Sequence, residues 1–196
     1  MFSHRIDHDV ELRLLHPRHA EAVFALIERS REHLGRWLGW VGGWRTIDDV
    51  RAYIKDSLYR TAENGGMFCG IWHQGELVGT IDLINVNLAS KRAEIGFWLG
   101  GEFEGRGLVI RACRTLIDHA FGAMELDWLV IHTKTENVRS RAVAERLGFQ
   151  HDGYLRHHDR EAYTLYRNEW RGRGSMRFTH PLRDDADLEL LLPWQG

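Results

Sequence analysis

The stretch that decides the fold runs from 93 to 133 and reads AEIGFWLGGEFEGRGLVIRACRTLIDHAFGAMELDWLVIHT. Its first seven residues, which are apolar except for Glu94 and Gly96, predict a strand, and four glycines between 100 and 107 interrupt the pattern after it. A helix is predicted from about 106 to 121, followed by a strand over 128–133. A strand, a helix and a second strand in this order predict a crossover between two parallel strands.

The segments on either side predict that the rest of the sheet is antiparallel. A hairpin signal, His73-Gln74-Gly75-Glu76, separates two apolar runs, and a helix over 137–147 closes at Gly148. The further strands are predicted, in chain order, over 10–14, 67–72, 77–84, 153–155 and 162–170. The expected fold class is therefore α/β, with a mixed, mostly antiparallel twisted sheet flanked by helices.

The composition is that of one globular domain and excludes several classes of protein. The chain has 196 residues, of which 43% are hydrophobic and 28% charged, with a formal net charge of −2. This balance argues against nucleic acid as the main partner, and no apolar run is long enough to span a membrane. Two cysteines and the lack of a recognisable signal peptide fit a cytoplasmic protein. The 12 histidines show no metal-ligand spacing, so no metal is expected.

The glycine loop is the first candidate site. It reads Glu104-Gly105-Arg106-Gly107-Leu108-Val109-Ile110-Arg111 and lies between a predicted strand and a predicted helix. Glycines let the backbone approach a ligand, and the free N–H groups of a helix N-terminus favour an anion such as a pyrophosphate. A tight turn that needs glycine only for its geometry is the plain alternative. A dinucleotide-binding loop is disfavoured because the third glycine of its motif is replaced, and a Walker loop is absent.

Several motifs resemble the GCN5-related N-acetyltransferase (GNAT) superfamily. The loop follows its Q/R-x-x-G-x-G/A pattern at Gly107 but departs from it at Glu104 and Val109. Residues 137–149 resemble the N-x-x-S-x-x-x-x-E-x-x-G-F signature of the RimJ/RimL-like branch, which acetylates ribosomal proteins on serine or alanine. Blocks at 32–41, 93–99 and 166–170 also resemble that branch, so the resemblance covers about 10 to 170.

The resemblance implies a GNAT fold with a splayed parallel pair of strands and acetyl-CoA as the co-substrate. The pantetheine arm would pair with a splayed strand, and the pyrophosphate would rest on the N–H groups around 105–110. Asn137 would bind the pantetheine or cap a helix, the two roles being equally open. The cofactor-binding residues implied in this way are Leu99, Gly105, Arg106, Gly107, Leu108, Val109, Ile110, Asn137 and Ser140.

The transfer needs a neutral amine and a proton for the departing thiolate. Many relatives use a Tyr where this chain has Ala144. The resemblance implies instead that Ser140 donates toward the sulfur and that Asp159 activates the amine through water, with Glu94 as the other candidate base. The plain alternatives are helix capping or CoA hydrogen bonding for Ser140, an ion pair for Asp159 and a solvated strand position for Glu94.

Three tryptophans, Trp37, Trp40 and Trp44, lie among glycines and cannot share one helical face. Aromatic side chains on glycine-rich segments suit a substrate-binding wall. The alternative is that they pack between helices and sheet.

The acetyltransferase domain is expected over 1–170, with a C-terminal extension over 171–196. Residues 178–193 resemble residues 2–17 without a gap. The extension is therefore interpreted as the start of a second copy, as an edge strand added to the sheet or to a partner subunit, or as a chance similarity.

The function expected from these observations is acetyl-CoA-dependent transfer to a primary amine, by direct transfer in a ternary complex. The acceptor is expected to be the N-terminal α-amino group of a protein of the ribosomal type, or an aminoacyl compound. The alternatives are a small-molecule amine or antibiotic acetyltransferase and a CoA-binding regulator without turnover. A homodimer is an expected assembly, with neither nucleic acid nor membrane as a partner.

Overall fold

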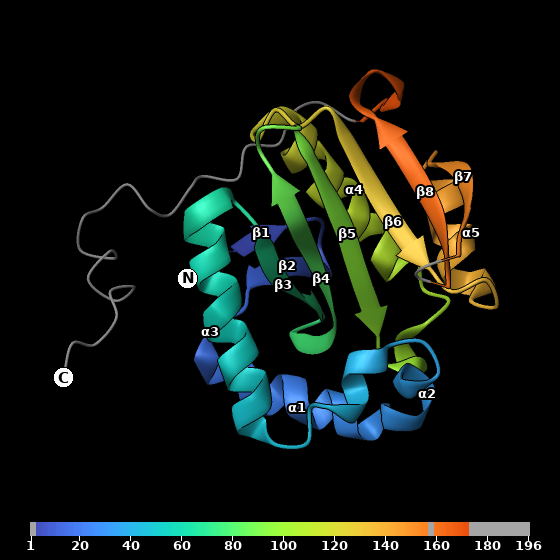
Figure 1. The fold of residues 1–196 in the computed structure, drawn as a ribbon. Helices are drawn as coiled ribbons and strands as arrows, with labels where there is room; N and C mark the ends of the chain where they lie inside the picture. Colours follow the sequence, from blue (N-terminus) through green and yellow to red (C-terminus); the bar gives the residue numbers. More distant parts are fainter. Residues whose placement is uncertain (1–2, 157–158, 173–196) are drawn as a thin grey trace.

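The computed structural model describes residues 3–156 and 159–172 (Figure 1). Its strands form one sheet in the order β1-β2-β3-β4-β5-β6-β8-β7, in which only β5 and β6 pair in parallel. This confirms the expected mixed, mostly antiparallel sheet. The strands are β1 (Ser3–Arg5), β2 (Val10–Leu14), β3 (Met67–His73), β4 (Glu76–Asn87), β5 (Arg92–Leu99), β6 (Trp128–Thr133), β7 (Gln150–Leu155) and β8 (Arg160–Tyr166).

Helices flank this sheet. In Figure 1, α4 lies behind the central strands, and α1 and α2 lie below them, near the end of β5. Within the described ranges, no helix is both long and apolar enough to cross a membrane. The α-helices are α1 (Ala20–Arg29), α2 (Arg31–Gly35), α3 (Ile47–Asn64), α4 (Leu108–Gly122) and α5 (Val138–Arg146), and the 3-10 helices are η1 (Pro17–His19), η2 (Gly39–Gly42), η3 (Gly101–Phe103) and η4 (Arg167–Glu169).

Local sequence signals set the ends of the long helices. Thr46 caps α3 in a reciprocal box with Asp49, and Gly65 ends it in the left-handed conformation at φ 79°. The helix α4 buries one broad apolar face, including Leu108, Leu116 and Ile117, against the sheet. Burying each such side chain stabilises the fold by about 1.5–3 kcal/mol. The core thus holds α4 firmly behind β4 and β5.

The parallel pair β5–β6 is short and then separates. Only Arg92–Glu94 of β5 pairs with Trp128–Val130 of β6, although β5 continues to Leu99 and β6 to Thr133. On the far side of β6, the pairing with β8 continues as far as Thr133 and Glu161. Beyond Glu94 the backbone of β5 therefore turns unpaired groups toward the gap, which is the splayed arrangement implied by the resemblance.

Several segments differ from the sequence-based expectation: β4 continues to Asn87, beyond its predicted end at 84, and β7 begins at Gln150, before its predicted start at 153. The last strand ends at Tyr166 rather than continuing to 170, because η4 follows and the Glu169 carboxylate accepts a hydrogen bond from the Tyr166 N–H at 3.0 Å. The short strand β1 was not predicted. The proposed repeat over 178–193 lies outside the described residues.

Candidate active site

A cavity of about 600 Å³ lies beside the unpaired end of β5. Its size is typical of small-molecule sites. Residues from β5, α2, the start of α4 and α5 line it, so the glycine loop and the N-x-x-S segment meet at one place. The lining residues that the resemblance implied are Leu99, Gly105, Gly107, Leu108, Val109, Ile110, Asn137 and Ser140, and Trp37, predicted as part of a substrate-binding wall, also lines the cavity.

The start of α4 offers backbone donors to this cavity. The helix begins at Leu108 after Gly107, and no side chain caps it. The first N–H groups of a helix have no partner within it, so those near 108–110 are free to bind an anion. Gly105 and Gly107 adopt φ of 75° and 70°, and space is open where their side chains would stand. These residues fit the pyrophosphate of acetyl-CoA.

The N-terminus of α5 forms the opposite wall. Asn137 caps this helix, since its side-chain oxygen accepts a hydrogen bond from the Ser140 N–H at 3.1 Å. This cap places Ser140 in the first turn, facing the cavity. The sequence reasoning missed Arg139, Val143 and Arg146, although their i, i+4, i+7 spacing marks one helix face. Arg146 adds positive charge to this wall of the cavity.

Glu104, the acid that replaces the family's Gln or Arg, is paired with a cation and also contacts a histidine. Its carboxylate forms an ion pair with Arg139 of α5, and its other oxygen lies 3.1 Å from His33 Nε2 of α2. The charge therefore joins α2, the glycine loop and α5 instead of standing alone against a phosphate. Arg106 lies outside the cavity lining, with its guanidinium bound to the Glu102 carbonyl at 3.1 Å.

Trp40 and Trp44 also lie outside the cavity lining. They stack on each other at 4.3 Å between ring centroids, and Trp44 contacts Tyr53 of α3 at 4.9 Å. Trp40 in turn contacts Trp98, which lines the cavity. Both rings are partly buried against the core, so the structure places them in the packing between η2, α3 and the sheet.

The candidate bases lie at two different places. Glu94 stands at the last parallel pair, where its carboxylate binds His132 Nδ1 at 3.2 Å and accepts from Asn85 at 3.0 Å. The hydrogen bond and charge of His132 outweigh burial and lower the pKa of Glu94. Asp159 precedes β8, is exposed, and accepts a hydrogen bond from the Tyr154 hydroxyl at 2.6 Å. Neither residue lines the cavity.

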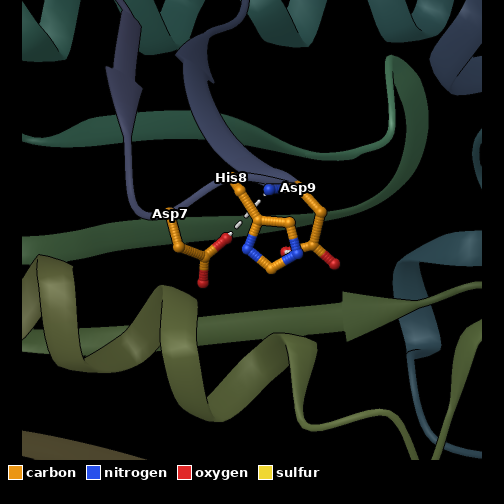
Figure 2. Close-up of side chains that lie close together, drawn as sticks. All are labelled: Asp7, His8 and Asp9. Carbon is orange, nitrogen blue, oxygen red and sulfur yellow. Dashed lines mark hydrogen bonds and ion pairs between the residues drawn. The ribbon is translucent and has the colours of Figure 1, made fainter.

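An acidic cluster that does not line the cavity lies near the start of the chain, in the turn between β1 and β2. Figure 2 shows Asp7, His8 and Asp9 side by side, an arrangement that could suggest a metal site. However, both carboxylates bind Arg111 of α4 at 2.7 Å, and Asp9 also binds His73 at 3.1 Å. The guanidinium already supplies the positive charge, so this cluster anchors β1 and β2 to α4.

Comparison with known proteins bears on this site. Residues 9–150 match the family model of the acetyltransferase (GNAT) domain. The chain is 36% identical over 181 residues to YdaF of Bacillus subtilis (strain 168), which covers 88% of this chain and 99% of that protein. It is 27% identical over 152 residues to the ribosomal-protein-serine acetyltransferase of Escherichia coli (strain K12), covering 78% and 85%.

A solved structure has the same fold. The structure of RimL, a ribosomal alpha-N-protein acetyltransferase in complex with coenzyme A, superposes with a TM-score of 0.79 at 21% identity. The match covers 83% of this chain and 96% of that one.

Proposed function

This chain belongs to the GNAT family of N-acetyltransferases, and on that premise we propose that its acceptor is the N-terminal α-amino group of a protein of the ribosomal type. Membership makes it an acetyl-CoA-dependent acyltransferase. The observation that carries the choice of acceptor is the match to a ribosomal-protein-serine acetyltransferase over 85% of that enzyme.

Different residues of the cavity would bind different parts of the co-substrate. When bound, acetyl-CoA supplies the acetyl group as an activated thioester. The N–H groups at the start of α4 would hold its pyrophosphate, and the unpaired backbone of β5 at 97–99 would pair with its pantetheine arm. Arg146 would add positive charge for its phosphates, whereas Arg139 is paired with Glu104.

The proposed role of Ser140 follows from its position, whereas the two candidate bases are those that the resemblance implies. Ser140 faces the cavity from α5, and in this proposal its hydroxyl donates a proton to the departing thiolate. The amine must lose its proton before it attacks, and Asp159, acting through water, and Glu94 are the proposed bases. If the variants Ser140→Ala and Asp159→Asn both kept full turnover, these two assignments would be wrong.

The pKa of the acceptor favours an α-amine. An α-amino group has a pKa of about 7.7–8.0, against about 10.4 for a lysine side chain. Deprotonation at neutral pH therefore costs roughly 1 kcal/mol for the first and roughly 4–5 kcal/mol for the second. A carboxylate base of ordinary strength is sufficient for the α-amine.

The test is a screen of thiol release from acetyl-CoA against several acceptors. Peptides that begin with Ser or Ala should release thiol, whereas the same peptides with a blocked N-terminus should not. Release with free polyamines or aminoacyl nucleotides alone would replace this proposal by a small-molecule acceptor. Heat stabilisation by acetyl-CoA without release with any amine would indicate a regulator.

A further inference from the structure

Asp82 of β4 is an acidic residue that none of the roles above uses. It pairs with Gly96 of β5, and Ile84 two residues later pairs with Glu94. Because side chains alternate along a strand, Asp82 and Glu94 lie on the same face of the sheet. Tyr53 of α3 packs over Phe68, the β3 partner of Asp82, so α3 borders this face.

The carboxylate of Asp82 lies against Gly96, in the part of β5 that no longer pairs with β6. A Cβ built on Gly96 would overlap Asp82 Oδ1 and lie 3.1 Å from its Cγ. Only a glycine at 96 leaves this space for the carboxylate. Gly96 lies two residues beyond Glu94, where β5 has parted from β6, so Asp82 is held beside the mouth of the gap.

No cation within ion-pair distance neutralises Asp82 among residues 3–156 and 159–172. The nearest candidate, Arg60 of α3, already pairs with Asp56. Burial, together with the charge of Glu94, raises the pKa of Asp82 to about 7. The charged or titratable groups on its side of the sheet are Tyr53 and Arg60 from α3, and Glu94 from β5 with its partner His132 from β6, while Cys69 of β3 lies on the opposite face.

We propose that Asp82 and Glu94 form the subsite that binds the acceptor as an ammonium ion, and that Asp82, in place of the candidate bases Asp159 and Glu94 named above, accepts its proton. The inference rests on the proposed function and names how the acceptor is recognised. An ammonium supplies the positive charge that this carboxylate lacks, and it enters on the face of the gap that Asp82 and Glu94 share. In this arrangement Asp82 accepts a proton from the acceptor amine, whereas Ser140 donates a proton to the departing sulfur.

The step balances as follows. One N–H bond of the ammonium breaks, and its proton moves to a carboxylate oxygen of Asp82. The freed nitrogen lone pair forms the C–N bond with the acetyl carbon, while the C–S bond breaks and its electron pair remains on sulfur. A second proton from nitrogen reaches sulfur by way of Ser140, and Asp82 returns its proton to water.

The test compares full-length wild type with Asp82→Asn, using a peptide that begins with Ser and acetyl-CoA. We expect kcat/KM to fall by about 10²-fold at pH 6.5. At about pH 9 most of the α-amine is already neutral, so the loss should shrink to a few-fold. A purely structural role for Asp82 would give the same loss at both pH values.

Two controls keep the outcomes separate. Heat stabilisation of Asp82→Asn by acetyl-CoA should equal that of the wild type, which shows that the cofactor side is intact. Asp152→Asn removes a similar charge from the distant strand β7 and should leave kcat/KM unchanged. A loss below threefold at pH 6.5, or an equal loss at both pH values, overturns this proposal. Absence of turnover in the wild type overturns the proposed function instead.

Discussion

Two acidic clusters of this protein look alike in composition and behave in opposite ways. At the β1–β2 turn, Asp7 and Asp9 share the guanidinium of Arg111, and these contacts hold the pKa of Asp9 well below its usual range. On the sheet face, Glu94 is paired with His132, but within the described ranges no cation lies within ion-pair distance of Asp82, and the pKa of Asp82 rises to about 7. The difference lies in the counter-charge and not in the number of carboxylates.

This contrast separates a structural cluster from a functional one. A carboxylate bound to a fixed cation, such as Asp7 or Asp9 with Arg111, holds two elements of the fold together. A carboxylate kept out of water without a cation costs stability, and such strained positions concentrate where a ligand completes the charge balance. The Asp7–Asp9 cluster joins the sheet to α4. In our proposal, Asp82 and Glu94 instead bind a positively charged acceptor.

The largest expected effect concerns the stability of Asp82→Asn. Folding raises the pKa of the Asp82 carboxyl, so the native state favours its protonated form. The free energy of unfolding is therefore highest below about pH 4, and part of it is lost as the pH rises through about 7. The variant should therefore exceed the wild type by about 2–4 kcal/mol near pH 8 and equal it near pH 4. Urea unfolding at both pH values measures this, and a variant weaker near pH 8 would contradict it.

The opposite sign is expected at the other cluster. Arg111→Met leaves two partly buried carboxylates without their cation and should lower Tm by about 3–6 °C at neutral pH. Because folding lowers the pKa of Asp9, its stabilisation exists above about pH 4 and is lost as the pH falls. Calorimetry should show the two proteins converging below about pH 4. A constant difference down to pH 3 would refute the anchoring role.

The smallest effect is expected at Glu104, which resembles the anchored cluster but lines the cofactor cavity. Glu104→Gln frees Arg139 and removes a negative charge, so acetyl-CoA should bind about two- to fivefold tighter. The matched variant Arg139→Ala should bind more weakly. Titration calorimetry at low salt measures both, and weaker binding by Glu104→Gln would show that the acid supports the loop.

Local patterns were sufficient for most of the fold. The strand 128–133 has the predicted bounds, and α4 begins two residues later than predicted, because Gly107 serves as its N-cap. The strand β1 was missed because it has only three residues and is tied to α4 through Asp7 and Arg111, which are far apart in sequence. A contact between residues so far apart in sequence produces no local periodicity from which the strand could be predicted.

The candidate site was predictable where the backbone builds it and not where side chains from distant elements do. The glycine loop and the cap at Asn137 are local motifs, and both line the cavity. Nothing near Glu104 in the sequence shows that Arg139 neutralises it or that His33 contacts it. Likewise, only the register of β4 against β5 places Asp82 over Gly96.

The most direct test of the central claim uses one peptide that begins with Ser and carries an internal Lys. The wild-type chain is incubated with this peptide and acetyl-CoA at pH 7.5, and fragment masses locate the acetyl group. The account predicts a single acetyl group on the first residue, with an equal amount of thiol released. Acetylation of the Lys side chain alone, or no acetylated product, would contradict it.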